Sequence, residues 1–204
     1  PLETAIHKMT GLTAATFGFT DRGVIKVGAH ADLTLFDATE VAETATFTKP
    51  IVGAINGIAY GAGAQLTTML DIRIGCENTE IQFLAAKYGR ANSTWSLPLV
   101  VGMPKAKELL FTGRPIRAEE GERIGLLNQV VHSSQLLDTC IAMAKQIGEN
   151  DPRMVQGIKK LLDDGVGAPW RERFDAEQNA RKNKLKANSP KEGFKAFLDR
   201  KGIS

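Results

Sequence analysis

A short apolar run, a glycine-rich turn and a helical pattern follow one another between residues 50 and 70. This succession constrains the fold more than any other part of the chain. Residues 51–55 read Ile-Val-Gly-Ala-Ile, which predicts a short buried strand. Residues 56–63 are rich in small side chains and predict a turn, and residues 64–70 predict a helix. A strand that leads through a turn into a helix is typical of an α/β fold.

The same turn carries the strongest chemical signal in the sequence. A glycine-rich turn that enters a helix exposes backbone N–H groups at the positive helix end. Such groups can bind a phosphate or stabilise a developing oxyanion. The spacing Gly61-x-Gly63 completes neither a dinucleotide fingerprint nor a phosphate loop. On spacing alone, a purely structural role for these glycines is equally consistent.

The remaining pattern predicts three segments of different character. A helix over residues 2–10 and two short strands within residues 24–36 are expected before the first boundary at residue 48. Residues 49–132 are expected to form the α/β core, with further strands at 71–76, at 80–83 and around 130–131. Residues 133–204 are expected to be helical, with helix starts at Asp151-Pro152 and Ser189-Pro190.

Composition excludes several classes of protein. The 204 residues are 43% hydrophobic and 24% charged, which is ordinary for a globular chain, and no apolar run is long enough to cross a bilayer. We expect Cys76 and Cys140 to be small buried hydrophobes. The cysteines and the three histidines show no metal-ligand spacing, so we predict no metal and a cytoplasmic location. Pro1 is not an initiator methionine, so we expect a trimmed or processed start; no secretory signal is visible.

Positive charge is concentrated at the C-terminal end. Residues 181–204 hold eight basic and two acidic residues, whereas the rest of the chain has a small excess of acids. A solvated helical face explains this most simply, and an anion site for phosphates is the functional alternative. Basic residues do not alternate with aromatic ones here, so we expect no nucleic-acid partner.

Residues 49–204 contain a series of motifs in a fixed order. The series begins with Lys49-Pro50-Ile51-Val52-Gly53-Ala54-Ile55-Asn56-Gly57 and continues through Gly61-Ala62-Gly63-Ala64-Gln65-Leu66. Further motifs are Asp71-Ile72-Arg73-Ile74, Leu97-Pro98, Lys105 to Arg114, Asn128-Gln129-Val130-Val131 and Glu192-Gly193-Phe194-Lys195-Ala196-Phe197-Leu198. Together these motifs resemble the enoyl-CoA hydratase/isomerase (crotonase) family, and their order along the chain makes the resemblance specific.

The resemblance implies a partial crotonase-like spiral of ββα units followed by C-terminal helices. It implies that acyl-CoA thioesters bind there, with coenzyme A as part of the substrate and no separate cofactor. Two backbone N–H groups would stabilise the thioester enolate, one of them from Ala62. The coenzyme A contacts would come from Tyr60, Gly61 and Gly63 in the turn and from Lys195, Phe197 and Lys201 near the C-terminus. The family also implies a homo-oligomer, a trimer or a hexamer.

The sequence departs from the family where its hydratases carry two catalytic glutamates. Gln65 occupies the first of these positions, and no Glu or Asp lies between Glu80 and Glu108. Lys87, Tyr88 and Asn92 are the polar candidates near the second position, and a loop or helix-surface role is the simpler explanation for each; of the three we select Asn92. We expect Trp95 in the core. An amide orients water but cannot act as a general base, so we predict weak or altered hydratase or isomerase activity.

Residues 1–48 do not match the segment in which the family carries its other oxyanion donor. They resemble instead the C-terminal part of a D-aminoacylase-type amidohydrolase. The resemblance rests on Gly23, Gly28 and Ala31-Asp32-Leu33 within the run from Asp21 to Asp37. The metal ligands of that family lie upstream, and His7 and His30 are not at ligand positions.

These observations leave three hypotheses open. The first is an enoyl-CoA hydratase/isomerase-like enzyme that binds acyl-CoA and stabilises an enolate. The second is a non-catalytic protein, fused or truncated, that keeps the second half of a crotonase core. The third is an amidohydrolase (deacylase) fragment, which the missing metal ligands make the weakest.

Overall fold

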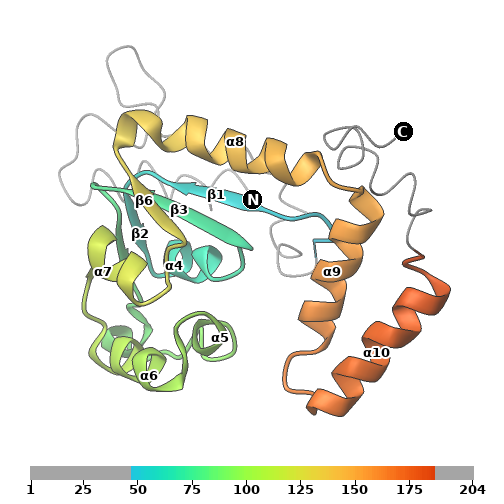
Figure 1. Ribbon diagram of the computed structural model, residues 1–204. Coiled ribbons are helices and arrows are strands. Elements are labelled where there is room, and N and C mark those ends of the chain that lie inside the picture. The colour runs from blue at the N-terminus through green and yellow to red at the C-terminus, as the bar shows by residue number, and fades with distance from the viewer. Residues whose placement is uncertain (1–46, 187–204) are drawn as a thin grey trace, which may run out of the picture. The chain divides into compact units, whose positions relative to one another are not determined.

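The computed structural model describes residues 47–186 (Figure 1). Six strands and the helices α4 to α10 follow one another in this range. The predicted helix over residues 2–10, the strands within 24–36 and the helix starting at Ser189-Pro190 lie outside the described residues. Lys195, Phe197 and Lys201 lie outside them as well.

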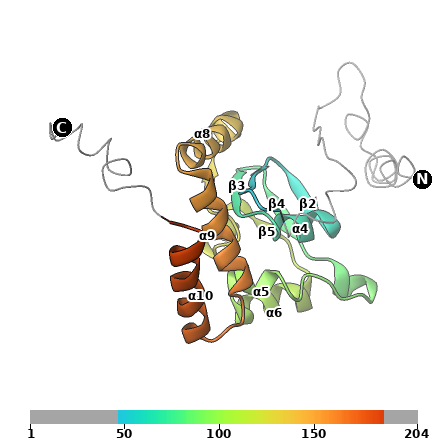
Figure 2. The ribbon, with the colours of Figure 1, turned by 90° about the vertical axis from the view of Figure 1, so that its right-hand side faces the viewer.

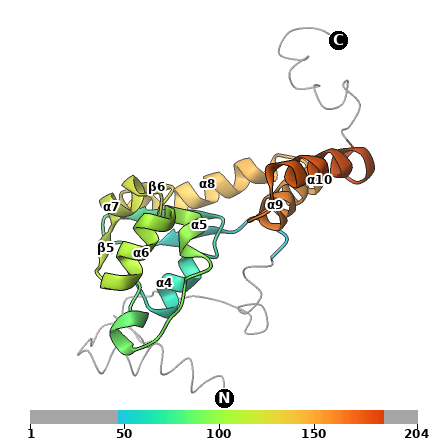
Figure 3. The same ribbon diagram turned by 90° about the horizontal axis from the view of Figure 1, so that it is seen from below.

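The first sheet contains three parallel strands in the order β1-β3-β6. Its members are β1 (Val52–Ile55), β3 (Ile72–Cys76) and β6 (Gln129–Val131). Parallel neighbours need a long crossover, which β2 (Ile58–Tyr60) and α4 (Ala62–Thr67) supply between β1 and β3. Helix α8 (Leu136–Gly148) lies along this sheet and runs from β6 to the start of α9 (Figures 1 and 3). The strands predicted for 51–55, 71–76 and 130–131 are therefore present.

The second sheet is built from shorter strands. It contains β2 (Ile58–Tyr60), β4 (Glu80–Gln82) and β5 (Ile116–Arg117) in the order β2-β4-β5, with β2 parallel and β5 antiparallel to β4. The prediction of a continuous turn over residues 56–63 was wrong, because β2 occupies its centre. Pairing with β4 stabilises this strand, and three residues are too few to show a period in the sequence. The two-residue strand β5 escaped prediction for the same reason.

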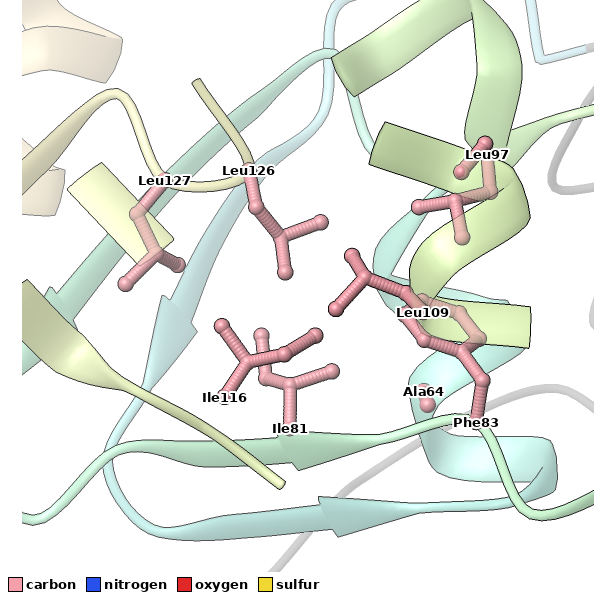
Figure 4. Close-up of a cluster of buried hydrophobic side chains, with 9 residues drawn as sticks. Ala64, Ile81, Phe83, Leu97, Leu109, Ile116, Leu126 and Leu127 are labelled. Atoms are coloured by element: carbon pink, nitrogen blue, oxygen red, sulfur yellow. The ribbon is translucent and has the colours of Figure 1, made fainter. Parts of the chain in front are cut away.

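The main hydrophobic core lies between the second sheet and the helices α4 (Ala62–Thr67), α5 (Leu97–Val101) and α6 (Met103–Thr112). Helix α7 (Ala118–Arg123) follows β5. Figure 4 shows side chains from β4, from α6 and from the segment before β6 pointing toward one another. None of the core side chains is more than 2% exposed: Ala64, Ile81, Phe83, Leu97, Ala106, Leu109, Ile116, Leu126 and Leu127.

A second cluster lies between the first sheet and α8. It consists of Ile74 and Cys76 from β3 and of Leu136 and Cys140 from α8. Both cysteines are buried free thiols, which confirms the prediction that they are small hydrophobes. Burial raises the pKa of the Cys140 thiol, because a thiolate is poorly solvated in an apolar cluster.

Helices α9 (Pro152–Asp164) and α10 (Trp170–Asn183) lie side by side and contain no fully buried residue (Figure 2). The predicted start of α9 is confirmed, because Asp151 Oδ1 accepts a hydrogen bond of 2.9 Å from Arg153 N. Lys159 Nζ lies 2.6 Å from Asp71 Oδ2 and ties α9 to the residue before β3. Beyond α10, Leu185 packs over Gly157.

Two short 3-10 helices complete the structure: η2 (Ala85–Tyr88) after β4 and η3 (Ser133–Gln135) before α8. The segment between η2 and α5 corrects one expectation. Trp95 is 54% exposed, so the prediction that it lies in the core was wrong. The chain places Ser93, Ser96 and Leu97 inside instead, and Trp95 points to the surface.

Candidate oxyanion site

The turn between β2 and α4 (Ala62–Thr67) is formed by one glycine in a left-handed conformation. Gly61 has φ +57° and ψ −111°, which costs an L-residue with a Cβ far more than it costs glycine. Its N–H donates to the Gln82 carbonyl at 2.9 Å, and its carbonyl accepts from Gln65 N at 3.0 Å. These two bonds attach the start of α4 to β4 and hold the turn in place.

Ala62 follows as the first residue of α4. An N–H at this position has no acceptor within the helix, because the carbonyl four residues earlier is not part of it. The Ala62 side chain is exposed, so the first turn of the helix is open at this point. A Cβ added to Gly63 would meet only Ala59 Cβ, at an ordinary 3.8 Å. The turn therefore needs glycine at position 61, and the N–H of Ala62, which has no acceptor within the helix, can donate to an anionic oxygen.

Tyr60 precedes this turn and is held by the second sheet. Its hydroxyl donates to the carboxylate of Glu80 on β4, and Arg117 Nε lies 3.6 Å from the other Glu80 oxygen. The hydrogen bond to Glu80, together with partial burial, raises the pKa of Tyr60 to about 12. The phenol therefore stays protonated at neutral pH, and its contact with coenzyme A remains a prediction.

Gln65 lies one turn after Ala62 on α4 and is partly buried. Its backbone carbonyl accepts a hydrogen bond of 2.7 Å from Thr68 Oγ1, and Thr68 Oγ1 also lies 2.7 Å from Ser96 Oγ. This pair of buried hydroxyls holds the segment before α5 against the last turn of α4. The sequence analysis selected Gln65 on α4 and Asn92 in the segment before α5. The hydroxyl contact between Thr68 and Ser96 attaches these two segments to each other.

Asn92 and Ser93, in the segment between η2 and α5, each bury a side-chain oxygen. Asn92 Oδ1 and Ser93 Oγ are buried, and neither has a hydrogen-bond partner among the described residues. Ser93 is fully buried and has φ +57°, alone among non-glycine residues in the described range. The sequence analysis selected Asn92 and missed Ser93. Only the polar type of Ser93 could have drawn attention to it, because its burial follows from the folded chain.

Two other kinds of site were sought in residues 47–186. This range contains no group of three or more His, Cys, Asp or Glu side chains that could hold a metal ion. No helix in the same range combines the length and apolar character that crossing a bilayer requires.

Comparison with known proteins decides the family. The sequence profile of the enoyl-CoA hydratase/isomerase family matches residues 20–203. The chain belongs to this family. The comparisons contain nothing that bears on the amidohydrolase resemblance of residues 1–48, which remains a prediction. The enoyl-CoA hydratase/isomerase profile overlaps part of this segment, because its match begins at residue 20.

Individual relatives agree with this family. A short-chain-enoyl-CoA hydratase of Clostridium acetobutylicum is 32% identical over 158 residues, which are 76% of this chain and 60% of the relative. A short-chain-enoyl-CoA hydratase of Clostridioides difficile is 33% identical over 73% of this chain and 97% of its own length. The chain thus spans 60% of the length of the first of these relatives.

Solved structures confirm the predicted crotonase-type α/β fold. The crystal structure of an enoyl-CoA hydratase from Bacillus anthracis aligns with a TM-score of 0.73 and 30% identity. The alignment covers 79% of this chain and 64% of that one. An enoyl-CoA hydratase of Geobacillus kaustophilus aligns with a TM-score of 0.72 and 26% identity.

Proposed function

We propose that this enoyl-CoA hydratase/isomerase family chain binds acyl-CoA thioesters and stabilises their enolates at Ala62. The observation that carries the proposal is the first turn of α4, where Gly61 and β4 hold the N–H of Ala62 without an intrahelical acceptor. Negative charge develops on the thioester oxygen when an enolate forms. A fixed N–H donor stabilises that charge more than the neutral thioester, which lowers the barrier.

We propose further that hydration is weak or altered in this chain. Addition of water to an enoyl thioester requires a group that accepts a proton from the water and a group that donates one to carbon. Gln65 and Asn92 occupy the positions considered for this role, and amides can orient water without accepting its proton. The loss of general acid–base catalysis lowers the rate about 10²–10⁴-fold for each group.

Calorimetric titration with acetyl-CoA and a short enoyl-CoA tests binding, and the loss of enoyl absorbance tests turnover. Ala62→Pro removes the donor while proline fits the first helical position. Any turnover should fall about 10²–10³-fold in this variant. Ala62→Gly keeps the N–H and should retain the wild-type rate within a few fold. Absence of heat and of thermal stabilisation with both thioesters would refute acyl-CoA binding.

A non-catalytic binding protein is the second candidate, and one observation favours it. Amides stand at both positions considered for proton transfer, Gln65 and Asn92, and an amide does not accept a proton from water. Binding without turnover would support this candidate, whereas turnover comparable to that of ordinary hydratases would exclude it. The deacylase hypothesis has no supporting observation among the described residues.

The proposal also assigns coenzyme A contacts to the basic C-terminal tail, residues 181–204. We propose that Lys195, Phe197 and Lys201 contact the nucleotide part of coenzyme A, as the family resemblance implies; they lie outside the described residues. Tyr60, Gly61 and Gly63 are proposed to contact the thioester end. Lys201→Ala should weaken coenzyme A binding more at low salt than at high salt, because exposed charges are screened.

We propose a homo-oligomer, a trimer or a hexamer. Large apolar side chains are exposed on α9 and α10, with Leu162 61% and Trp170 73% exposed. In the described range β1 pairs on one side only, with β3, which leaves an open sheet edge. Light scattering of the purified protein measures its mass, and a well-folded monomer would contradict the proposal.

We also propose a cytoplasmic location. The support is that Cys76 and Cys140 are both free thiols, as is usual in reducing compartments. Cell fractionation with an antibody against the native protein tests the location.

A further inference from the structure

Arg73 on β3 is a charged side chain that the fold buries. Only 7% of this residue is exposed, and burial lowers the pKa of its guanidinium, although the Asp71 carboxylate opposes that shift. The usual pKa of arginine lies so far above neutrality that the group stays charged. A buried cation is costly unless its donors are paired. Among residues 47–186, the acceptors that we find for this guanidinium are all backbone carbonyls.

The guanidinium of Arg73 joins two segments of the body. Its Nε donates to the Leu126 carbonyl at 2.8 Å, in the segment before β6. Its Nη1 donates to the Thr67 carbonyl at 3.3 Å and to the Leu70 carbonyl. Thr67 is the last residue of α4, and Leu70 lies three residues beyond it. One planar group therefore attaches the C-terminal end of α4 to the segment before β6.

The backbone of Arg73 is fixed independently of its side chain. Arg73 N donates to Asn128 Oδ1 at 2.8 Å, and the Arg73 carbonyl accepts from Asn128 N at 2.8 Å. Strand β3 also pairs with β1 on one side and with β6 on the other. The guanidinium therefore reaches α4 from a strand that is held on both sides.

Helix α4 depends on contacts at its two ends. It has six residues, so it forms few hydrogen bonds of its own. At its N-terminal end the Gly61 N–H donates to the Gln82 carbonyl at 2.9 Å. At its C-terminal end Arg73 donates to carbonyls that the helix itself leaves unpaired, and its charge complements the negative end of the helix dipole.

We propose that Arg73 is a positioning residue for the oxyanion turn. By holding the C-terminal end of α4, it fixes the direction in which the Ala62 N–H points. The inference rests on the proposed function, in which Ala62 is the donor. Misplacement of a donor by about 1 Å costs about 10²-fold in rate, so an anchor at the far end of so short a helix matters to the site. The contacts of the guanidinium are with the backbone, so Arg73 acts through α4.

Amide exchange in the free protein tests the anchor. Arg73→Lys keeps the charge, but one ammonium cannot reproduce a planar fork that donates in two directions. The amides of Gln65, Thr68 and Met69 donate within and just after α4 at 3.0–3.1 Å, and they should exchange about tenfold faster in this variant. Amides of α8 should keep their wild-type rates. Arg73→Met is the second variant, since it folds without a buried ammonium, and the same change is expected.

Ile74→Val is the matched control. Ile74 is the next residue on β3, is 1% exposed and packs in the second cluster, against α8. Its truncation should lower the melting temperature without a change confined to the amides of α4. The control therefore separates a loss of stability from a loss of the anchor.

Paired titrations test the consequence for the proposed site. Butyryl-CoA carries a neutral thioester oxygen, whereas a nitroalkyl-CoA in its anionic nitronate form carries negative oxygens, as an enolate does. The wild type should bind the nitronate more tightly. Both Arg73 variants should lose about fivefold of this preference and bind butyryl-CoA as before, because only the charged oxygen depends strongly on the donor. Ile74→Val should keep the preference, since a loss of stability alone does not distinguish the two ligands.

Wild-type exchange rates in α4 of both Arg73 variants would overturn the inference. An unchanged nitronate preference despite faster exchange would overturn it as well, because the anchor would then not reach Ala62. Failure of the wild type to bind either compound, or to prefer the nitronate, would refute the proposed function. Amide exchange would still decide whether Arg73 holds α4, so the two proposals fail separately.

Discussion

The α/β body from β1 to α8 and the helical pair α9–α10 are stabilised in different ways. The body contains both buried clusters, and the buried side chains of these clusters are at most 6% exposed. The pair contains no fully buried residue and exposes Ile158, Leu162 and Trp170 by more than half. Removal of apolar surface from water stabilises the body, whereas a few specific contacts hold the pair.

The difference shows which part of the molecule buries its apolar surface within a single copy. Both buried clusters lie in the body, so a change there disturbs many neighbours. The pair shows an apolar surface that a single copy leaves in water, which is the surface type that interaction sites share. The proposed oxyanion turn lies in the body, where the Gly61 N–H donates to the Gln82 carbonyl on β4.

Truncation of a phenylalanine to alanine should destabilise the body much more than the helical pair, and this is the largest difference that we expect between the two regions. Phe83→Ala removes a ring that is 1% exposed, and the free energy of unfolding should fall by about 3–5 kcal/mol. Phe174 is 49% exposed, so Phe174→Ala should cost less than about 1 kcal/mol. Urea unfolding of the two variants measures both values. Equal losses would mean that Phe174 is covered in solution, and the contrast between the regions would not hold.

Two glycines that leave no room for a Cβ allow a second test. A Cβ on Gly75 would lie 2.8 Å from Leu127 Cδ1 and 3.0 Å from Thr79 Oγ1, so Gly75→Ala should cost about 1–3 kcal/mol. A Cβ on Gly157 would lie 2.5 Å from Leu185 Cδ2, the end of a flexible side chain. Gly157→Ala should therefore displace only Leu185. Thermal unfolding compares the two, and a larger loss at Gly157 would contradict this ranking.

The ion pair between Lys159 and Asp71 tests whether α9 and α10 unfold independently of the body. Lys159 Nζ lies 2.6 Å from Asp71 Oδ2, and the Lys159 side chain is 10% exposed. Lys159→Met keeps the apolar stem and removes the charge, so amide exchange should quicken in α9 and α10 and stay unchanged in β3. We expect a local loss of roughly 1–3 kcal/mol. Lys160→Met, whose pair with Asp164 is exposed, is the control. Faster exchange in β3 would show that the regions unfold together.

The smallest effect is expected for Tyr60 at high pH. Its folded pKa is about 12, above the usual value of 10.0, because its hydroxyl donates to Glu80. The hydrogen bond therefore stabilises the body fully below pH 10 and is lost as the pH rises toward 12. Tyr60→Phe should be less stable than the wild type at pH 8 and equal to it at the upper limit. A stability difference that grows with pH would contradict this assignment.

Much of the body could be predicted from local patterns. The strands at 51–55, 71–76 and 80–83 and the helix after Gly61 follow from apolar runs and glycine placement, which are properties of neighbouring residues. The cap at Asp151 is equally local. Strand β2 was missed because its three residues gain their stability from β4, twenty-two positions away at Ile58 and Glu80.

The candidate site likewise contains a local part and a part that depends on distant contacts. Gly61, Ala62 and Gln65 lie close together in the sequence, so the sequence alone indicates that they share one turn and the start of a helix. Ser93 could not be identified in this way, because its burial and its unpartnered hydroxyl are properties of the folded chain rather than of its sequence neighbours. Trp95 shows the same limit, since its size predicted burial and the chain turned it outward.

Residue types and short-range spacing suffice to identify the α/β class, the family resemblance and the glycine-rich turn. Three features follow only from the folded chain: β4 holds the turn, α9 and α10 leave apolar side chains exposed, and Asn92 and Ser93 bury oxygens that have no partner in the described range. Burial and hydrogen-bond satisfaction depend on which distant segments meet, and local preferences do not specify those contacts.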